Sequence, residues 1–391
     1  MPFSNRRNFF KISGLSILPV ILPFSGFSSF HSINDVPPAD EPLVKFFGDG
    51  EMFEPGAYLD ILMKINAADP LVKDRYGEGG AVAVLEKKME IITGKEKALF
   101  MPSGTMANQL AIARLNTNST KVFVQETSHV FRDEGDAAQA VFNKRLMPLA
   151  KGEPYFTAAL LKQAIESLAE EEAFTSGIGT VSIENPVRRS DGRMVPIEEI
   201  RAISEYCRSH NIKLHLDGAR IFMAAAWSGI TVKEYAAYFD TVYISLYKYL
   251  GAAAGAILCG QKMLMDEMPH QVKIHGGSMY GNWANAAMAL HRLQGLEDRL
   301  QKAKNNAAVL FDALNKIQGI QINALQGGTN IYELQLAKGI NGNRVQSILK
   351  DTWFIRIPRP DKNNRTLLTV NETLLYRDTT YLVEAFKKSI A

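Results

Sequence analysis

The sequence predicts an α/β protein with a large domain on a mostly parallel sheet and a smaller α+β domain at the C-terminal end. Two observations carry this prediction. From Lys97 to about residue 280, short apolar runs alternate with helical patterns, which is typical of a parallel sheet covered by helices on both faces. After Gly281 the alternation gives way to a long helical stretch followed by shorter strands. The 391 residues suffice for two or three domains.

Each element follows from its local pattern. Apolar runs of four or five residues predict strands at 121–124, 180–183, 213–216, 241–244 and 254–258. Helical spacing predicts helices at 158–169 and 197–208, and Pro196 supports the start of the second one. In the C-terminal part we expect one long helix over 284–308 and strands at 331–335 and 366–370.

The N-terminus is predicted to be a targeting segment. Residues 5–11 carry Arg6, Arg7 and Lys11 and resemble a twin-arginine (Tat) export signal, and an interrupted apolar run covers 12–27. That run is too short and broken for a stable membrane span. We expect an export signal over 1–34 and a periplasmic or otherwise exported protein, with a cytoplasmic location as the alternative.

The predicted domain organisation follows from these changes in pattern. Residues 35–69 would contribute to the small domain, 70–280 would form the large domain, and 281–391 the small C-terminal domain. The three basic residues of the signal account for the whole net charge of +3, which leaves 41 basic and 41 acidic residues. That balance gives no support for nucleic-acid binding.

Two residues at neighbouring strand ends indicate the chemistry. Asp217 ends the strand predicted at 213–216, and Lys248 follows the next strand about thirty residues later. Ligands of parallel sheets gather beyond the carboxyl ends of the strands. A lysine amine that bonds to an aldehyde, with a carboxylate that keeps a pyridine nitrogen protonated, is what a pyridoxal phosphate enzyme requires.

A phosphate site is predicted at the start of a helix. Ser103, Gly104 and Thr105 follow the apolar run 98–101 and open a helical pattern. Backbone amides at a helix N-terminus bind phosphate without a basic side chain, and the two hydroxyls add donors. The alternative is an ordinary helix cap. The seven histidines show no metal-site spacing, so no metal is expected.

These motifs together resemble the threonine aldolase and aromatic amino acid β-eliminating lyase family, whose members are fold-type I pyridoxal phosphate enzymes. The resemblance runs from about Phe47 to the C-terminus and implies the fold-type I architecture. The blocks that carry it, in chain order, are Tyr76–Gly80, Pro102–Met106, Ser128–His129, Glu184–Asn185, Asp217–Arg220 and Lys248.

The resemblance implies further roles. His129 would stack on the cofactor ring and can serve as a base, and Glu184 would contact the cofactor. Arg220 would lie near the cofactor hydroxyl and the substrate carboxylate, as suits a guanidinium. Tyr76 would form part of the pocket rim. A homo-oligomer is implied, a dimer at least and a tetramer by resemblance.

Substrate-facing positions depart from the family pattern. A serine that helps hold the substrate is Gly48 here, and the residue before the lysine is Tyr247 instead of serine. A histidine near the substrate is Val187, and an arginine after the Gly-Gly-x-Met turn is Tyr280. The cofactor residues are kept, so the resemblance supports the cofactor more firmly than the aldolase reaction.

The substrate-carboxylate clamp also differs. The late arginine of the family aligns with Leu367, and Arg365 and Arg356 are the candidates to replace it. We expect a lyase for a β-hydroxy or β-substituted amino acid, acting by retro-aldol cleavage or β-elimination. The alternatives are a racemase or transaminase on the same scaffold, or an exported binding protein that has lost catalysis. The changes predict poor cleavage of threonine and better activity on a bulkier amino acid.

Overall fold

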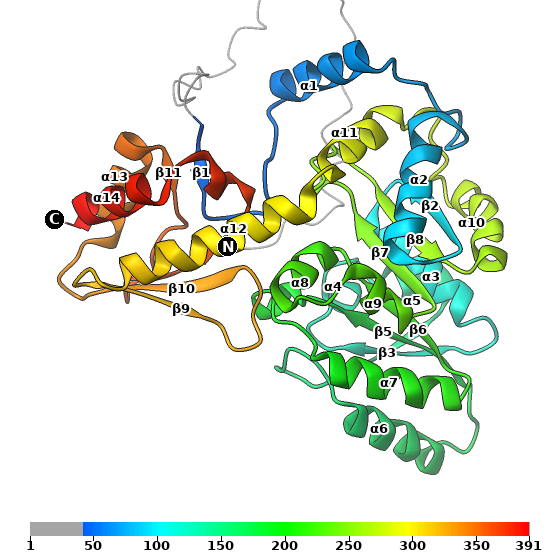
Figure 1. The fold of residues 1–391 in the computed structure, drawn as a ribbon. Coiled ribbons are helices and arrows are strands. Elements are labelled where there is room, and N and C mark those ends of the chain that lie inside the picture. Colours follow the sequence, from blue (N-terminus) through cyan, green and yellow to red (C-terminus); the bar gives the residue numbers. More distant parts are fainter. Residues whose placement is uncertain (1–41, 391) are drawn as a thin grey trace, which may run out of the picture. The chain divides into compact units, whose positions relative to one another are not determined.

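A seven-stranded sheet forms the centre of the structure, a computed structural model that describes residues 42–390 (Figure 1). The strand order is β2-β8-β7-β6-β5-β3-β4, and β8 alone runs antiparallel to its neighbours. The predicted mostly parallel sheet is therefore confirmed. Its strands are β2 (Lys97–Met101), β3 (Lys121–Gln125), β4 (Arg145–Leu149), β5 (Ile178–Glu184), β6 (Lys213–Asp217), β7 (Thr241–Ser245) and β8 (Ala256–Gly260).

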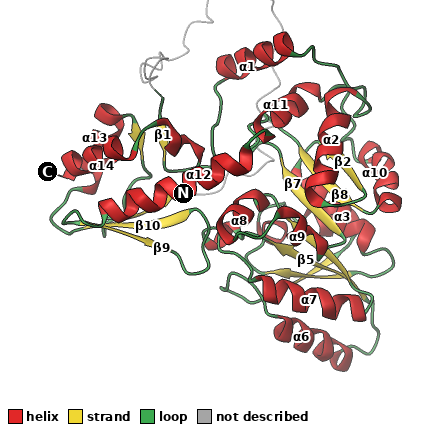
Figure 2. Ribbon diagram, in the orientation of Figure 1, coloured by secondary structure: helices red, strands yellow, loops and turns green. Residues whose placement is uncertain are grey.

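Helices cover both faces of this sheet (Figure 2). Because side chains alternate along each strand, Leu214 and Leu216 of β6 face one layer while His215 and Asp217 face the other. The first layer is a large apolar core that includes residues of α2 (Gly80–Thr93), α7 (Ile197–Ser209), α8 (Ile221–Ser228) and α9 (Val232–Ala237). The second layer contains α3 (Gly104–Leu115) and α10 (Lys262–Ile274).

The remaining helices of this part lie between the strands in sequence. They are α4 (His129–Arg132), α5 (Ala137–Phe142) and α6 (Ala158–Glu171), and α6 and α7 confirm the two helices predicted there. Helix α3 packs on β5 to β8, and Asn108 in its second turn contacts Asp217 at the end of β6. That position decides which side chains of α3 reach the candidate site.

The long helix predicted at 284–308 is wrong as a single element. The structure has α11 (Trp283–Leu293) and α12 (Leu296–Leu314), with a break at Gln294 and Gly295. Gln294 is extended at the end of α11, and Gly295, the N-cap of α12, adopts φ 63°, a left-handed conformation that glycine takes without strain. The apolar spacing continues across the break, and this is why the sequence pattern alone suggested one helix.

The C-terminal part has its own apolar core beside a three-stranded sheet. The sheet order is β12 (Arg365–Thr369), β10 (Ile331–Leu336) and β9 (Ile320–Ala324), all antiparallel, and the two predicted strands are confirmed. Helices α13 (Gly342–Trp353) and α14 (Thr379–Ile390) complete it. Helix α12 contributes to both cores, Leu296 and Leu300 to the first and Leu310 to the second.

The segment at 42–68 contributes to both cores. Strand β1 (Val44–Lys45) pairs with β11 (Ile355–Arg356), and Val44 lies in the C-terminal core. Helix α1 (Pro55–Ala68) instead packs Leu62 into the first core. The domain boundaries at 69/70 and 280/281 stay predictions, as does the export signal over 1–34, which lies outside the described residues. Within 42–390, no helix is long and apolar enough to cross a membrane.

Candidate active site

Three parallel strands end at the candidate site. Glu184 is the last residue of β5, Asp217 ends β6, and Lys248 follows β7 by three residues. Asp217 and Lys248 are 2% and 7% exposed, so both charged groups are buried in the structure. The Lys248 amine lies 4.7 Å from the centre of the Tyr247 ring. Within residues 42–390 it makes no hydrogen bond or ion pair, so it is available to react.

Two donors orient the Asp217 carboxylate. Oδ1 accepts a hydrogen bond from the backbone N–H of Ala219 at 3.2 Å, and Oδ2 accepts one from Asn108 Nδ2 at 2.9 Å. The first donor comes from the turn after β6 and the second from α3. Because both oxygens are held, the carboxylate is fixed in one plane, with lone pairs left for a further donor.

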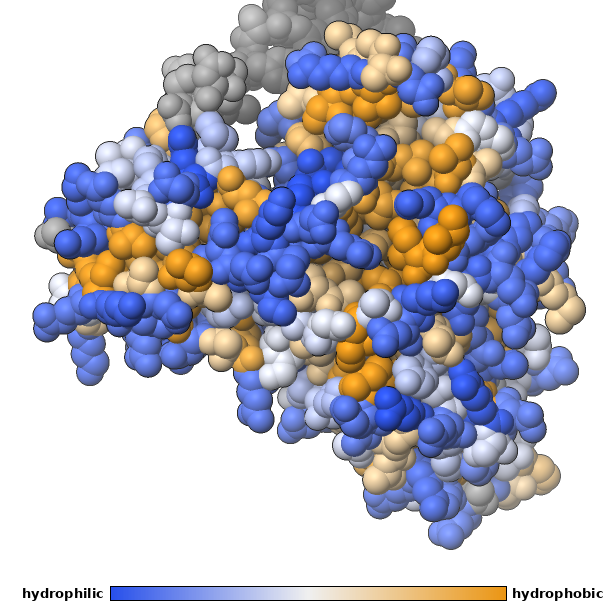
Figure 3. Space-filling view, in the orientation of Figure 1, coloured by the Kyte–Doolittle hydropathy of each residue, from blue (hydrophilic) through white to orange (hydrophobic). Residues whose placement is uncertain are grey.

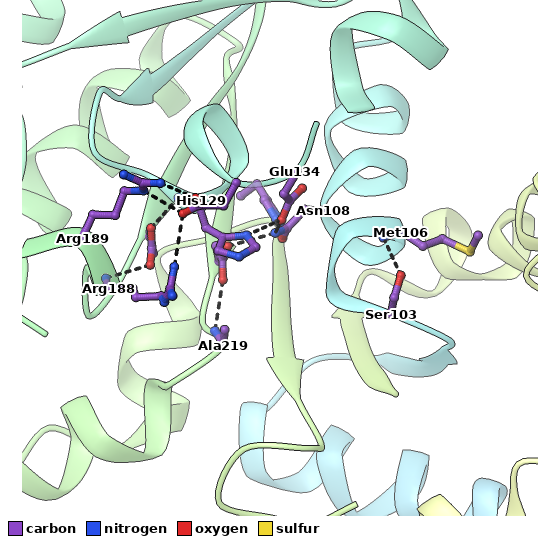
Figure 4. Close-up of polar contacts among 12 residues, drawn as sticks. Ser103, Met106, Asn108, His129, Glu134, Arg188, Arg189 and Ala219 are labelled. Atoms are coloured by element: carbon purple, nitrogen blue, oxygen red, sulfur yellow. Dashed lines mark hydrogen bonds and ion pairs between the residues drawn. The ribbon is translucent and has the colours of Figure 1, made fainter. Parts of the chain in front are cut away.

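His129 forms a charge-linked pair with Glu134. The Nδ1 of His129 lies 2.9 Å from Oε1 of Glu134. This hydrogen bond raises the pKa of His129, and burial raises the pKa of Glu134. In Figure 4, His129, Glu134 and Asn108 point toward one another. The pair can therefore hold a proton beside Asp217, and His129 keeps Nε2 for another partner.

Glu184 holds the two loops that border the site. One oxygen accepts the backbone N–H of His129 at 2.7 Å, and the other accepts that of Arg188 at 2.9 Å. Burial raises the pKa of Glu184 to about 7. Nearby, Asp133 pairs with both Arg188 and Arg189. A contact between Glu184 and a cofactor stays a prediction, since both of its oxygens already accept backbone hydrogen bonds.

Arg220 is held by a carboxylate that the sequence analysis did not assign. Its Nε and one terminal nitrogen donate to the two oxygens of Asp49, at 2.6 and 2.9 Å. This bidentate contact occupies one edge of the guanidinium and leaves the other terminal nitrogen for a substrate. Arg220 is thus fixed by the segment that precedes α1. The edge of the guanidinium that binds Asp49 is no longer free for the predicted contact with the substrate carboxylate.

The turn between β2 and α3 has the geometry of a phosphate cradle. Ser103 is the N-cap of α3, and its Oγ accepts a hydrogen bond from the backbone N–H of Met106 at 3.2 Å (Figure 4). A Cβ on Gly104 would lie 2.1 Å from the Tyr243 hydroxyl, so only glycine fits. Within the described chain, the partly exposed Thr105 has no side-chain hydrogen bond. The amides of this first turn can therefore receive an anion.

Two buried hydroxyls beside the site have no partner within residues 42–390. They are the Oγ of Ser128, which precedes His129, and the Oη of Tyr249, which follows Lys248. A buried polar atom without a partner is uncommon, and such an atom often faces a bound ligand, ion or water molecule. Together with the glycine cradle and the available lysine amine, these hydroxyls make the residues present fit pyridoxal phosphate.

An aromatic pair lies in two loops near the cradle. Tyr76 and Tyr280 meet edge to face with ring centres 5.3 Å apart, and Lys273 lies 5.1 Å over the Tyr76 ring. Both tyrosines are exposed. The loop before Tyr280 approaches the cradle, because a Cβ on Gly277 would lie 2.4 Å from the sulfur of Met106. The rim role predicted for Tyr76 is compatible with this placement and stays a prediction.

The structure gives physical reasons for two of the family departures. Gly48 adopts φ 75°, where a side chain is strained, so the turn that delivers Asp49 favours glycine over serine. Val187 is fully buried in the first core, where a histidine would be desolvated. Arg365 pairs with Asp361 at 3.6 Å and its side chain is 49% exposed. The substrate contact assigned to Arg365 stays a prediction.

Four site residues were missed by the sequence analysis: Asn108, Glu134, His215 and Asp49. A signal existed for Asn108, which interrupts the apolar face of α3 one turn after Gly104. Glu134 lies five residues after His129, but its contact depends on how α4 and α5 turn. His129, Glu134 and Asp217 each have one atom that could bind a metal ion, and these three atoms lie within 4.8 Å of one another. The Asn108 amide already donates to both carboxylates, so this cluster is better described as a hydrogen-bonded network than as an open metal site.

Comparisons with known proteins show which family this chain resembles. The "Beta-eliminating lyase" family model matches residues 61–337. A low-specificity L-threonine aldolase of Candida albicans is 30% identical over 284 residues, 72% of this chain and 75% of that protein. The alanine racemase TOXG of Cochliobolus carbonum is 31% identical over 212 residues, 53% of this chain and 52% of that protein.

A solved structure shares the fold. A putative L-allo-threonine aldolase from Listeria monocytogenes superposes with a TM-score of 0.73 at 24% identity, over 89% of this chain and 96% of that one. The family model covers well over half of the chain, from residue 61 to residue 337. This chain belongs to the β-eliminating lyase family and has the fold of the threonine aldolase-like, pyridoxal phosphate-dependent enzymes.

Proposed function

We propose that this protein is a pyridoxal phosphate-dependent lyase that cleaves a β-hydroxy or otherwise β-substituted amino acid. The observation that carries the proposal is the placement of Asp217 and Lys248 at adjoining strand ends, with the His129–Glu134 pair beside them. The relatives named as threonine aldolases support a retro-aldol reaction to glycine and an aldehyde. A good leaving group on the β-carbon would give β-elimination instead.

Each part of the site has a role in holding the cofactor. Lys248 would bond to its aldehyde, Asp217 would pair with the ring nitrogen, and His129 would stack on the ring. The amides of Gly104 and Thr105, with the Ser103 hydroxyl, would hold the phosphate. When bound, the cofactor would accept the electron pair of a bond to the α-carbon as that bond breaks.

The chain's own residues orient and protonate the substrate. Arg220, fixed by Asp49, offers its remaining terminal nitrogen to the substrate carboxylate. His129 and Glu134 hold a proton between them at the edge of the site, which suits transfer to or from the β-substituent. The amine of Lys248 would be a second base at the same centre.

The substrate is proposed to be bulkier than threonine. Val187 points into the core and contributes no imidazole, while the half-exposed Tyr247 ring borders the amine of Lys248. A visible absorption spectrum of the purified protein, followed by steady-state assays on threonine isomers, phenylserine and amino acids with β-leaving groups, tests the proposal. We expect higher kcat/KM for phenylserine than for threonine. If protein incubated with excess pyridoxal phosphate showed no absorbance of bound cofactor, the proposed reaction would be excluded.

A racemase is the second candidate, and the similarity to an alanine racemase favours it. Both reactions use a lysine amine and an electron sink, and they differ in which α-carbon bond breaks. Incubation with L-alanine in deuterated water separates them. A racemase would give deuterated D-alanine, whereas a lyase restricted to β-substituted substrates would leave net L-alanine unchanged.

We further propose that the protein is a homo-oligomer, a dimer at least and a tetramer by family resemblance. An apolar groove of about 1250 Å³ lies between α1, α2 and α11, lined among others by Ile65, Val84 and Leu290. Exposed Leu59 and Met63 lie on α1 beside it, and Figure 3 shows hydrophobic surface in this region. A second copy would cover this surface. Sedimentation analysis tests it, and a monomer at micromolar concentration would contradict it.

Export through a twin-arginine pathway remains our proposal for localisation. It is supported by Arg6 and Arg7 and the apolar run that follows. Exchanging both arginines for lysine should retain the protein in the cytoplasm, as judged by cell fractionation. Equal export of the variant would argue for another route.

A further inference from the structure

The candidate site contains a buried amide that contacts both of its acidic groups. Asn108 is fully buried in the second turn of α3. Its Nδ2 lies 2.8 Å from Oε1 of Glu134 and 2.9 Å from Oδ2 of Asp217, and its Oδ1 lies 3.0 Å from Nε2 of His215. Figure 4 shows Asn108 next to Glu134 and His129. One side chain therefore links the ring-nitrogen acid to the partner of His129.

The strand below α3 fixes which way this amide points. His215 and Thr241 are register partners on β6 and β7, and Nδ1 of His215 lies 2.8 Å from the Thr241 hydroxyl. Burial lowers the pKa of His215 to about 4, so its ring is neutral and carries one N–H.

The hydrogen positions follow by elimination. Asn108 Nδ2 faces carboxylate oxygens, which accept, so the amide nitrogen is the atom turned toward them and the amide oxygen faces His215. That oxygen needs a donor, so the His215 hydrogen is on Nε2, and the Thr241 hydroxyl donates to Nδ1. The chain of donors runs from Thr241 through His215 and Asn108 to the two carboxylates.

We propose that Asn108 is a positioning residue that holds the Asp217 and Glu134 carboxylates together through the two hydrogens of its amide. The inference rests on the proposed function, because it assigns Asp217 to the cofactor nitrogen and Glu134 to His129. Without the amide, two buried carboxylates would face each other with no donor between them. Each would lose a charge-assisted hydrogen bond, and Asp217 would lose its fixed orientation.

Other charged groups around His129 do not replace this amide. Glu134 of the loop between α4 and α5, Asp217 of β6 and Glu184 of β5 lie near His129. Asp133 is also close and is bound to Arg188 and Arg189. None of the three acids can donate a hydrogen bond to another while ionised. Among the described residues, Asn108 is the one donor that contacts Asp217 and Glu134 at once.

The test measures cofactor affinity in Asn108→Leu and Asn108→Asp, both close in size to asparagine. Leucine removes the donor and the acceptor, and aspartate keeps the acceptor for His215 but removes the donor. The dissociation constant for pyridoxal phosphate is measured by absorbance at several pH values. Losing a hydrogen bond to a charged group weakens binding about tenfold to hundredfold at pH of about 8.

Asn108→Asp has a signature that a merely structural role would not produce. A protonated aspartate carries one O–H donor, so its affinity relative to wild type should recover by at least about threefold as the pH falls to about 6. Asn108→Leu should show no such recovery. Should the leucine variant fail to fold, the pH dependence of the aspartate variant decides the question alone.

Asn116→Leu is the matched control. Asn116 is also buried, caps the C-terminal end of α3, and donates to the Ser119 carbonyl at 3.0 Å. The Asn116→Leu variant should lower the stability of the protein without changing the dissociation constant for the cofactor. Asn108 variants that bind like wild type at every pH would overturn the inference. If wild-type protein itself bound no cofactor, or bound it without using Lys248, the proposed function would fail instead.

Discussion

The substitution Gly104→Ala tests the phosphate cradle with one added methyl group. The new Cβ would lie 2.1 Å from Oη and 2.5 Å from Cζ of Tyr243, against about 3.5 Å or more for ordinary contacts. Tyr243 is 3% exposed in β7, so its ring has little room to withdraw. The first turn of α3 must then shift by roughly 1 Å, which moves the amides that would hold the phosphate.

The expected cost follows from this overlap. Adding a methylene to a packed core destabilises proteins by about 1–3 kcal/mol, and displaced amides should weaken cofactor binding about tenfold or more. Urea denaturation of the apoprotein measures the first effect, and titration with pyridoxal phosphate measures the second. Gly56→Ala is the matched control, because Gly56 also lies in the first turn of a helix and a Cβ there meets nothing within 4 Å.

A second-site variant sharpens the test. Tyr243→Val removes the hydroxyl and ring atoms that the new methyl would meet, so the double variant should lose less stability than the sum of the two single variants. Wild-type stability and wild-type cofactor affinity in Gly104→Ala would show that the turn tolerates a side chain. The cradle assigned to Ser103, Gly104 and Thr105 would then be refuted.

Three further predictions follow from the site and from the core. Borohydride reduction of the holoenzyme should leave a covalent label on Lys248, which peptide mapping would detect. A label on another lysine would show that Lys248 is not the residue that bonds to the cofactor. Asp217→Asn should keep the fold but lower kcat strongly, since an amide cannot hold the pyridinium proton; turnover near wild type would mean that another group does so. Burial raises the pKa of Glu86 to about 7 although the carboxylate accepts a hydrogen bond from Phe100 N–H. Because the pKa of Glu86 is raised in the folded protein, the stability that Glu86 contributes is complete below its ordinary pKa of 4.5 and is lost as the pH rises through about 7. Glu86→Gln should therefore be more stable than wild type by about 1–3 kcal/mol at pH of about 8 and equal to it at pH of about 4, measured by urea denaturation; parallel stability curves would contradict this.

The amino-acid sequence by itself determined the nature of most elements and the main chemistry. Alternating apolar runs and helical patterns are local properties, so the strands ending at Asp217 and preceding Lys248 followed from them. Parallel strands end at one edge of a sheet, and for that reason two residues about thirty positions apart could be assigned to one site. The Ser103–Thr105 turn was likewise recognisable because a glycine between hydroxyl residues opens a helix there.

Only the tertiary structure decided which groups complete the site. Arg220 meets Asp49 across 171 positions of sequence, and Asn108 meets Asp217 across 109. No periodicity records such a pairing, because it depends on how α3 packs on β6 and on where the segment before α1 lies relative to the turn after β6. The helix break at Gln294 and Gly295 is a further case: apolar spacing continues through it, while α12 after the break contributes residues to both cores.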